Sequence, residues 1–307
     1  MRKNIFILLI LSSILGSCGF EEEVISYGTT SVYFYNQEYN RNIVVGEGLD
    51  LKAGIMFSGL INNDQDRVVQ YDIDPSVILD PSKTMMPANY YTLSGTSQFV
   101  VPKGEEQGYV EIEIDSTAFL ADPKSLTGEY VIPFRLISST DVDSINTAKD
   151  YMVISVSYWA KQHGNYNYSG QTIRKSSGVA VDTLVYENTS TISESVRELE
   201  TVGPNMMKVI PDGTAGSKDP ASGKFSFNVE VPTLGGGSVI VTTGQGSAIE
   251  ISPDGSSVYD EASKTFYLSY QYNDGTYDCF ATDTMVFRNR IRDIQADGQG
   301  VNEWRGF

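Results

Sequence analysis

The sequence predicts an all-β protein of two modules, a β-sandwich followed by an antiparallel β-barrel or a strongly curved β-sandwich. Apolar and polar residues alternate with a period of two along most of the chain, and long helical periodicity is nearly absent. Asp-Gly pairs of the kind that close hairpins recur in the second half, at Asp254-Gly255 and Asp274-Gly275. With 40% hydrophobic residues, the 307-residue chain has enough apolar side chains for packed cores.

The first module is predicted from alternating segments that are separated by polar turns. In the clearest of them, Val110, Ile112 and Ile114 share one face and the intervening acidic residues share the other. The expected strands are Ser31–Tyr35, Leu49–Phe57, Arg67–Asp74, Gly108–Asp115, Glu129–Ile137 and Tyr151–Tyr158. Strands at this spacing indicate a sandwich over residues 29–158.

The second module, residues 159–307, is predicted from a further set of strands, and the boundary is expected near Tyr158–Gly164. The expected strands are Asn165–Arg174, Val179–Tyr186, Ser195–Thr201, Met206–Ile210, Lys224–Val231, Ser238–Thr243, Ala248–Ile251, Thr265–Tyr272 and Asp283–Arg288. Antiparallel strands in this number over such a length suit a barrel or a curved sandwich.

The N-terminal segment, residues 1–17, is predicted to be a lipoprotein signal peptide. A basic start precedes the apolar run Ile5–Leu11, which is too short for an ordinary membrane-spanning helix. The segment ends in Leu15-Gly16-Ser17-Cys18, which resembles the bacterial lipobox. That resemblance implies that Cys18 is lipidated and becomes the mature N-terminus; an ordinary secretory signal with an incidental cysteine is the alternative.

Residues 18–28 are expected to form an acidic tether behind the lipid. The cluster Gly19–Glu23 resembles the surface-export signal of Bacteroidetes lipoproteins, and a solvated linker is the alternative. We therefore expect a protein that is lipid-anchored in the outer membrane and faces the cell exterior. Cys279 is then the only structural thiol, and we expect it to be buried and inert because no His or Lys lies near it in sequence.

The charge and the scarce metal-binding residues exclude several functions. With 22 Lys+Arg against 39 Asp+Glu, the formal net charge of −17 argues against nucleic acid as a partner. One histidine and two cysteines cannot supply a His-rich metal site or a zinc ribbon, so no cofactor is expected. Asn62–Asp66 and Asp141–Asp143 offer oxygen ligands to calcium, but neither has EF-hand spacing, and acidic turns usually hold no ion.

The sequence offers little for catalysis, and we expect no enzyme. His163 is the only histidine and therefore the only base for a Ser-His-Asp triad, but it is expected to be exposed in the linker. No Gly-x-Ser-x-Gly motif accompanies it. Glu111 and Glu113 lie about 7 Å apart by strand rise, within range of a glycosidase pair, yet on the face that is normally solvated.

Four segments of the first module form one pattern, namely Asn89–Ser94, Val101–Gly104, Gly108–Ile112 and Tyr130–Phe134. The pattern resembles the N-terminal Ig-like domain, of unknown function, of Bacteroidetes surface lipoproteins of the Sus-like polysaccharide-utilisation type. Phe266–Tyr272 and Thr282–Arg288 resemble the β-rich C-terminal partner of that domain. The same Ig-like domain precedes the catalytic domain in some endo-β-N-acetylglucosaminidases, where it is an accessory. The resemblance thus implies an Ig-like sandwich and a glycan-associated lipoprotein, without catalytic residues.

Aromatic residues are the best candidates for a binding surface, because the apolar face of a sugar stacks on an aromatic ring while polar side chains bind its hydroxyls. The candidates are Tyr166, Tyr168, Tyr272, Tyr277 and Trp304. Packing within strands is the competing explanation for each tyrosine. The expected function is non-catalytic capture of extracellular glycan beside an outer-membrane uptake complex. The alternative is an adhesive or structural surface protein that binds another protein through its β-domains.

Overall fold

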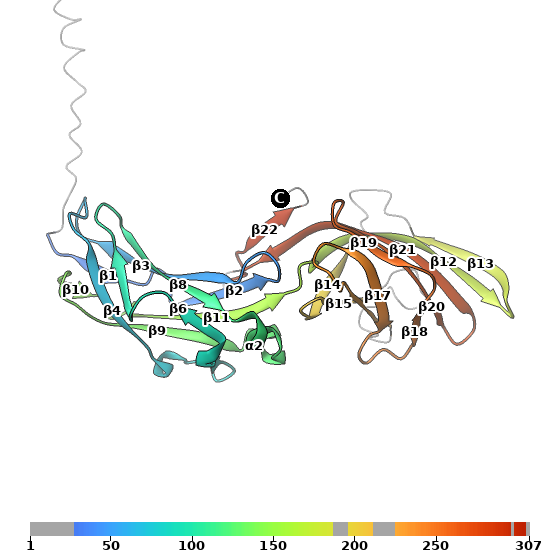
Figure 1. Ribbon diagram of the computed structural model, residues 1–307, viewed down its shortest axis with the longest axis horizontal. Helices are drawn as coiled ribbons and strands as arrows, with labels where there is room; N and C mark the ends of the chain where they lie inside the picture. Colours follow the sequence, from blue (N-terminus) through green and yellow to red (C-terminus); the bar gives the residue numbers. More distant parts are fainter. Residues whose placement is uncertain (1–27, 187–195, 211–224, 296–297, 305–307) are drawn as a thin grey trace, which may run out of the picture.

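The computed structural model describes residues 28–186, 196–210, 225–295 and 298–304 of the chain. Two β-rich modules lie beside each other in an elongated molecule (Figure 1), and the described residues are mostly in strands and turns. The all-β class is thereby confirmed. The predicted signal peptide, Cys18 and nearly all of the acidic tether lie outside the described residues. Within the described part, no helix is both long and apolar enough to cross a bilayer.

The first module is a sandwich of two sheets. In the described chain, one sheet has the order β10 (Ser144–Ile145), β1 (Ser31–Tyr33), β3 (Asp50–Ser58), β8 (Gln107–Ile114) and β6 (Tyr91–Leu93). The other has the order β2 (Glu38–Val44), β11 (Tyr151–Trp159), β9 (Tyr130–Ser139), β4 (Arg67–Ile73) and β7 (Gln98–Val101), and β5 (Thr84–Met85) pairs with β9. Short helical turns connect the strands: η1 (Pro75–Val77), η2 (Ala88–Tyr90), α2 (Ser116–Leu120) and η3 (Pro123–Leu126).

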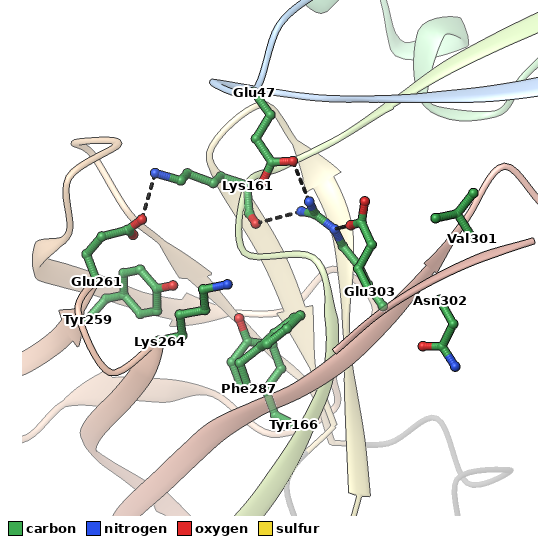
Figure 2. A pocket seen from close by; sticks show the side chains of 11 residues that line it. Glu47, Lys161, Tyr166, Tyr259, Glu261, Lys264, Phe287, Val301, Asn302 and Glu303 are labelled. Atoms are coloured by element: carbon green, nitrogen blue, oxygen red, sulfur yellow. Dashed lines mark hydrogen bonds and ion pairs between the residues drawn. The ribbon is translucent and has the colours of Figure 1, made fainter. Parts of the chain in front are cut away.

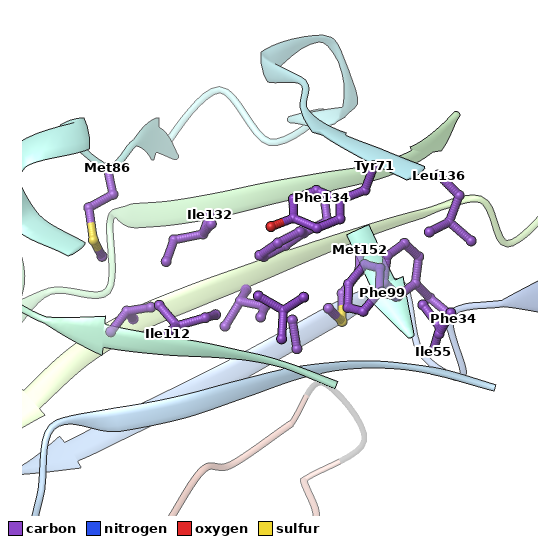
Figure 3. Packing of buried hydrophobic residues seen from close by; sticks show 14 of the residues in the cluster. Phe34, Ile55, Tyr71, Met86, Phe99, Ile112, Ile132, Phe134, Leu136 and Met152 are labelled. Atoms are coloured by element: carbon purple, nitrogen blue, oxygen red, sulfur yellow. The ribbon is translucent and has the colours of Figure 1, made fainter. Parts of the chain in front are cut away.

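The sandwich core forms where the alternating strands turn their apolar faces toward each other. Along β8, buried and exposed residues alternate without exception, as the sequence predicts. Figure 3 shows Ile112 of β8 and Ile132 of β9 on opposite sides of the core. The rings of Phe99 and Phe134 lie 6.1 Å apart between centroids, and both are fully buried. Burial of each such ring stabilises the fold by roughly 2–3 kcal/mol.

β2, the edge strand of one sheet, was not predicted from the sequence. Its first residues are polar, and only Ile43 and Val44 at its end are buried. A strand that pairs on one side only, parallel to β11, needs no strong alternation. On its other side, the backbone amide of Asn42 donates to the Asp293 carboxylate at 2.6 Å. A loop of the second module therefore covers this sheet edge, and this contact joins the two modules.

The second module is a closed antiparallel barrel. Its described strands pair in a ring in the order β12 (Gly164–Ser176), β14 (Val196–Gly203), β15 (Met206–Val209), β16 (Phe227–Glu230), β17 (Gly237–Thr243), β19 (Ser257–Asp260), β20 (Thr265–Asn273) and β21 (Asp278–Arg292). β21 then pairs with β12 and closes the ring. Three further strands flank the ring: β13 (Val179–Tyr186), β18 (Ile251–Pro253) and β22 (Val301–Trp304). The β12–β21 pair therefore shows that the second module is a barrel and not a curved sandwich.

The barrel interior holds a buried carboxylate. Asp283 of β21 is only 2% exposed. Its Oδ2 accepts hydrogen bonds from the hydroxyls of Tyr168 and Tyr270, the latter at 2.6 Å, and its Oδ1 accepts from Tyr186. Burying a charge is costly unless hydrogen bonds replace its water, and three phenol donors do so here. The three tyrosines and Asp283, hereafter the Asp283 cluster, therefore belong to the barrel core.

Candidate functional site

A cavity of about 560 Å³ lies at the junction of the two modules, within the range of roughly 300–1,000 Å³ that is usual for ligand pockets. We call it the junction pocket (Figure 2). The turn after β2 contributes Glu47, and the link between the modules contributes Lys161. The remaining lining residues come from the barrel and β22: Tyr166, Tyr259, Glu261, Lys264, Phe287, Arg290, Val301, Asn302 and Glu303.

Three aromatic residues form the inner wall of the junction pocket. The rings of Tyr166 and Phe287 meet edge to face, with centroids 5.4 Å apart. The Tyr166 hydroxyl donates to the Gln162 carbonyl at 2.8 Å, which anchors the link between the modules to the barrel. Tyr259 and Phe287 are 4% and 7% exposed, so only their edges reach the pocket. The wall is therefore rigid and apolar.

Arg290 joins three chain segments at the rim of the pocket. Its Nη2 lies 2.5 Å from the Glu47 carboxylate of the first module. Its Nε donates to Glu303 of β22, and its Nη1 donates to the Lys161 carbonyl at 3.3 Å. The Arg290 side chain is only 8% exposed, so these partners replace most of its water. Arg290 thus fixes the first module and β22 against the barrel.

The charges around the junction pocket balance. Lys161 pairs with Glu261 at 2.7 Å, and the Lys264 ammonium lies 5.3 Å from the centre of the Phe287 ring. Together with Arg290 and its two carboxylates, the described lining holds three cations and three carboxylates. A neutral ligand with many hydroxyl groups matches such a rim, because it can accept from the cations and donate to the carboxylates without adding charge.

The expectation of an exposed His163 is wrong. The residue is 7% exposed, and its ring stacks on Trp159 with 4.0 Å between ring centroids. Burial, assisted by the positive charge of Arg290, lowers the pKa of His163 to about 4. Its Nδ1 accepts from the backbone amide of Thr201 at 3.3 Å, so the neutral ring joins the link to the barrel. The short link Ala160–His163 is packed against the barrel, and this packing keeps the His163 ring out of solvent.

The aromatic residues predicted to bind ligand do not form one platform. Tyr168 and Tyr272 are 0% and 5% exposed in the barrel core, and Tyr166, which is part of the inner wall of the junction pocket, is 0% exposed to solvent. None of these three rings has an exposed face on which a sugar could stack. The reason is that β12 and β20 turn them toward the barrel interior.

The other two predicted aromatic residues remain candidates. Tyr277 is partly exposed, and the guanidinium of Arg174 lies 5.1 Å from the centre of its ring. Trp304 ends β22, the strand that carries Glu303 into the pocket, and its side chain lies outside the described residues. Ligand contact by Tyr277 or Trp304 stays a prediction.

The two acidic turns considered for calcium surround an arginine instead. Arg67, which is 6% exposed, donates to the Asn63 side chain at 2.8 Å and to Asp64 at 2.7 Å. It also donates to the Asp141 carbonyl. The guanidinium thus takes the oxygen atoms that a cation would need. Among the described residues, no group of three or more His, Cys, Asp or Glu is placed to hold a metal ion.

Of the residues that line the junction pocket, Tyr166 was predicted as a ligand-binding residue, but the charged residues were not predicted. Glu47 and Arg290 are separated by 243 positions, and Glu303 follows Arg290 only after a further turn. No local spacing signals a site that is assembled from distant segments. The only available signal was the expected module boundary, since pockets often lie between domains.

Comparisons with known proteins matched a family model to the first module and a solved structure to the two-module fold. A family model described as “-like, N-terminal domain” matches residues 27–143, which span most of the sandwich. A protein of unknown function from Bacteroides ovatus has a similar structure, with a TM-score of 0.68 and 21% identity, over 85% of this chain and 95% of that one. This likeness shows the two-module fold. The comparison with curated proteins gave no match.

A more distant likeness was also found. An auxiliary nutrient binding protein from Bacteroides thetaiotaomicron aligns over 84% of this chain and 92% of its own, with 12% identity and a TM-score of 0.44.

Proposed function

We propose that the protein is a non-catalytic surface lipoprotein that captures extracellular glycan for an uptake system. The observation that carries this proposal is the junction pocket, which combines an apolar wall with a charge-balanced, hydrogen-bonding rim. A neutral sugar unit has the same two-sided character, with C–H groups on its faces and hydroxyls around its edge. The lipid on Cys18 would confine the binder to the membrane and raise the local glycan concentration beside an importer.

The arrangement of the carboxylates supports binding over hydrolysis. Glu47 and Glu303 both accept hydrogen bonds from Arg290. A glycosidase acid must instead sit in apolar surroundings that favour its protonated form. The pair considered from the sequence is no better placed, because Glu111 and Glu113 are exposed on β8 and Glu111 pairs with Lys52 at 3.4 Å.

Affinity gels containing neutral polysaccharides test the binding proposal. We expect retention of the wild-type chain by at least one gel, without release of reducing sugar. Lys264→Ala combined with Asn302→Ala should weaken retention by about tenfold, equivalent to about 1.4 kcal/mol. The matched control Lys103→Ala changes an exposed lysine of the sandwich and should leave retention unchanged. Retention unaffected by the pocket variant, or release of reducing sugar, would overturn the proposal.

Palmitate labelling tests the anchor separately. Label should enter the wild-type chain and vanish in Cys18→Ala, because the thiol is the acceptor of the lipid. Protease treatment of intact cells should then remove the wild-type protein if it faces the exterior. Labelling that persists in Cys18→Ala would contradict the lipobox assignment.

One observation favours the alternative of a protein partner. β13 pairs only with β12 among the described strands, and Val179, Val181 and Val185 on it are 70%, 54% and 59% exposed. An apolar strand at a sheet edge can accept an added strand from another chain. If Val181→Lys abolished attachment of the protein to cells or matrix while glycan retention persisted, adhesion would be a second function.

A further inference from the structure

A second candidate binding site lies in the sandwich. A groove of about 290 Å³ opens beside β3 and β8, and we call it the tyrosine groove. Its described lining comprises Tyr35, Tyr39, Arg41, Lys52, Gly54, Ile55, Met56, Gln107, Tyr109, Met152 and Ile154. None of these residues is acidic, and two are cationic. In a chain with a net charge of −17, such a groove is an electropositive exception.

Tyr109 is held so that its ring lies against the strand backbone. It stands directly opposite Gly54 in the β3–β8 ladder. A Cβ on residue 54 would lie 2.7 Å from the Tyr109 ring, so only glycine leaves room for this position. The Tyr109 hydroxyl donates to the Gln107 side chain, and the residue is still 51% exposed. The fixed ring therefore presents an open aromatic surface, the element that the buried tyrosines of the barrel lack.

The two cations stand beside this surface with weak ion pairs only. The Arg41 guanidinium lies 4.8 Å from the centre of the Tyr39 ring and 3.9 Å from the Asp293 carboxylate. Lys52 is 3.4 Å from Glu111, and the side chains of both partners are more than 60% exposed. The Lys52 pair is exposed and contributes little, and the Arg41 pair, with side chains 31% and 17% exposed, is long at 3.9 Å, so both cations retain capacity for another anion.

We infer that the tyrosine groove binds a sugar unit that bears a carboxylate, such as a hexuronate within an acidic polysaccharide. The sugar ring stacks on Tyr109, Gln107 bonds its hydroxyls, and Arg41 and Lys52 bind the carboxylate. This inference extends the proposed capture of glycan to a second ligand class. It does not depend on the junction pocket, whose balanced charges suit neutral sugars.

Titration calorimetry with tetragalacturonate tests the inference, using the full chain with Cys18→Ser. We expect binding that weakens about tenfold in Tyr109→Ala and by a similar factor in Arg41→Gln combined with Lys52→Gln. Tyr109→Phe keeps the ring and should bind like the wild type, which also shows that the groove tolerates substitution. Added salt should weaken binding because it screens the cations. The carboxyl-reduced, neutral tetramer should bind at least tenfold more weakly than tetragalacturonate.

Matched controls separate this inference from the proposed function. Tyr267→Ala removes another half-exposed tyrosine, on the barrel, and Lys103→Gln removes an exposed lysine. Both should leave tetragalacturonate binding unchanged, as should Lys264→Ala combined with Asn302→Ala. Equal binding by Tyr109→Ala and wild type, or equal affinity for the neutral tetramer, overturns the inference. Retention on neutral gels without any binding of tetragalacturonate would refute the groove and leave the junction pocket standing.

Discussion

Each module holds a carboxylate that accepts hydrogen bonds from tyrosines, and the two clusters differ mainly in burial. In the sandwich, Asp122 accepts from Tyr90 at 3.0 Å and from Tyr130 at 2.5 Å, near the surface. In the barrel, Asp283 accepts from three tyrosines in the interior. The same chemical groups thus appear once where water is close and once where the protein has replaced it.

The causes of the tyrosine pKa shifts show what this difference means. Hydrogen bonding to Asp122 is the main reason that the pKa of Tyr130 rises to about 12. In the barrel, burial is the main reason that the pKa values of Tyr168 and Tyr270 lie well above the ordinary value, with the charge of Asp283 second. The sandwich cluster is therefore a local contact, whereas the barrel cluster depends on the closed fold around it.

The largest expected effect is loss of the buried carboxylate. Asp283→Ala should lower the free energy of unfolding by about 4 kcal/mol, because it leaves three enclosed hydroxyls without their acceptor. Urea unfolding monitored by the reactivity of Cys279, a buried free thiol in the same barrel, measures this loss. Cys18→Ser in every variant makes Cys279 the single thiol.

A second substitution shows whether unsatisfied hydroxyls are the cause. Adding Tyr168→Phe to Asp283→Ala removes one of the unpaired groups and should restore about 1–2 kcal/mol. If the double variant were less stable than Asp283→Ala alone, the stabilisation would lie in packing and the comparison of the two clusters would fail.

The next expected effect is a difference between the two modules in how their stability depends on alkaline pH. The pKa values of Tyr168, Tyr186 and Tyr270 are raised in the folded barrel, so above about pH 10 only the unfolded chain ionises these groups. Stability is therefore present below pH 10 and falls as pH rises, by about 4 kcal/mol per pH unit for three groups. In the sandwich, Tyr130 adds the loss of stability expected for one group, and only up to about pH 12, which is its pKa in the folded protein.

Tyrosinate absorbance and Cys279 reactivity, followed together between pH 10 and 12.5, measure the alkaline transition. Tyr168→Phe should remove about a third of the slope that the barrel cluster contributes. Independent ionisation of the three tyrosines before the thiol becomes reactive would show that water already reaches the Asp283 cluster in the folded protein.

Period-two alternation explains how much of these clusters the sequence could reveal. It places Tyr166 and Tyr168 on one face of β12, and Leu268, Tyr270 and Tyr272 on one face of β20, and the structure buries the members of each group together. Alternation cannot tell which face is inside, because barrel closure by the β12–β21 pair decides that. For this reason, Tyr166, Tyr168 and Tyr272 were predicted as ligand-binding residues and are found in the barrel core.

The junction pocket and the tyrosine groove were even less predictable from the sequence. The pocket needs Arg290 beside Glu47, and the groove needs Gly54 opposite Tyr109, so each depends on a pairing of distant segments. β2, which carries Tyr39 and Arg41, was not predicted at all, because its polar residues lie on an edge that the second module covers.

The smallest expected effect concerns Asp122, the partly exposed counterpart of Asp283. Asp122→Ala should lower the free energy of unfolding by only about 1 kcal/mol, because water can replace the carboxylate at Tyr90 and Tyr130. Part of that loss comes from η3, where Asp122 also accepts from the Lys124 amide at 2.9 Å as the N-cap. Asp122→Ser, which retains a capping oxygen, should therefore cost less than Asp122→Ala. If Asp122→Ala cost as much as Asp283→Ala, burial would not be what distinguishes the two clusters.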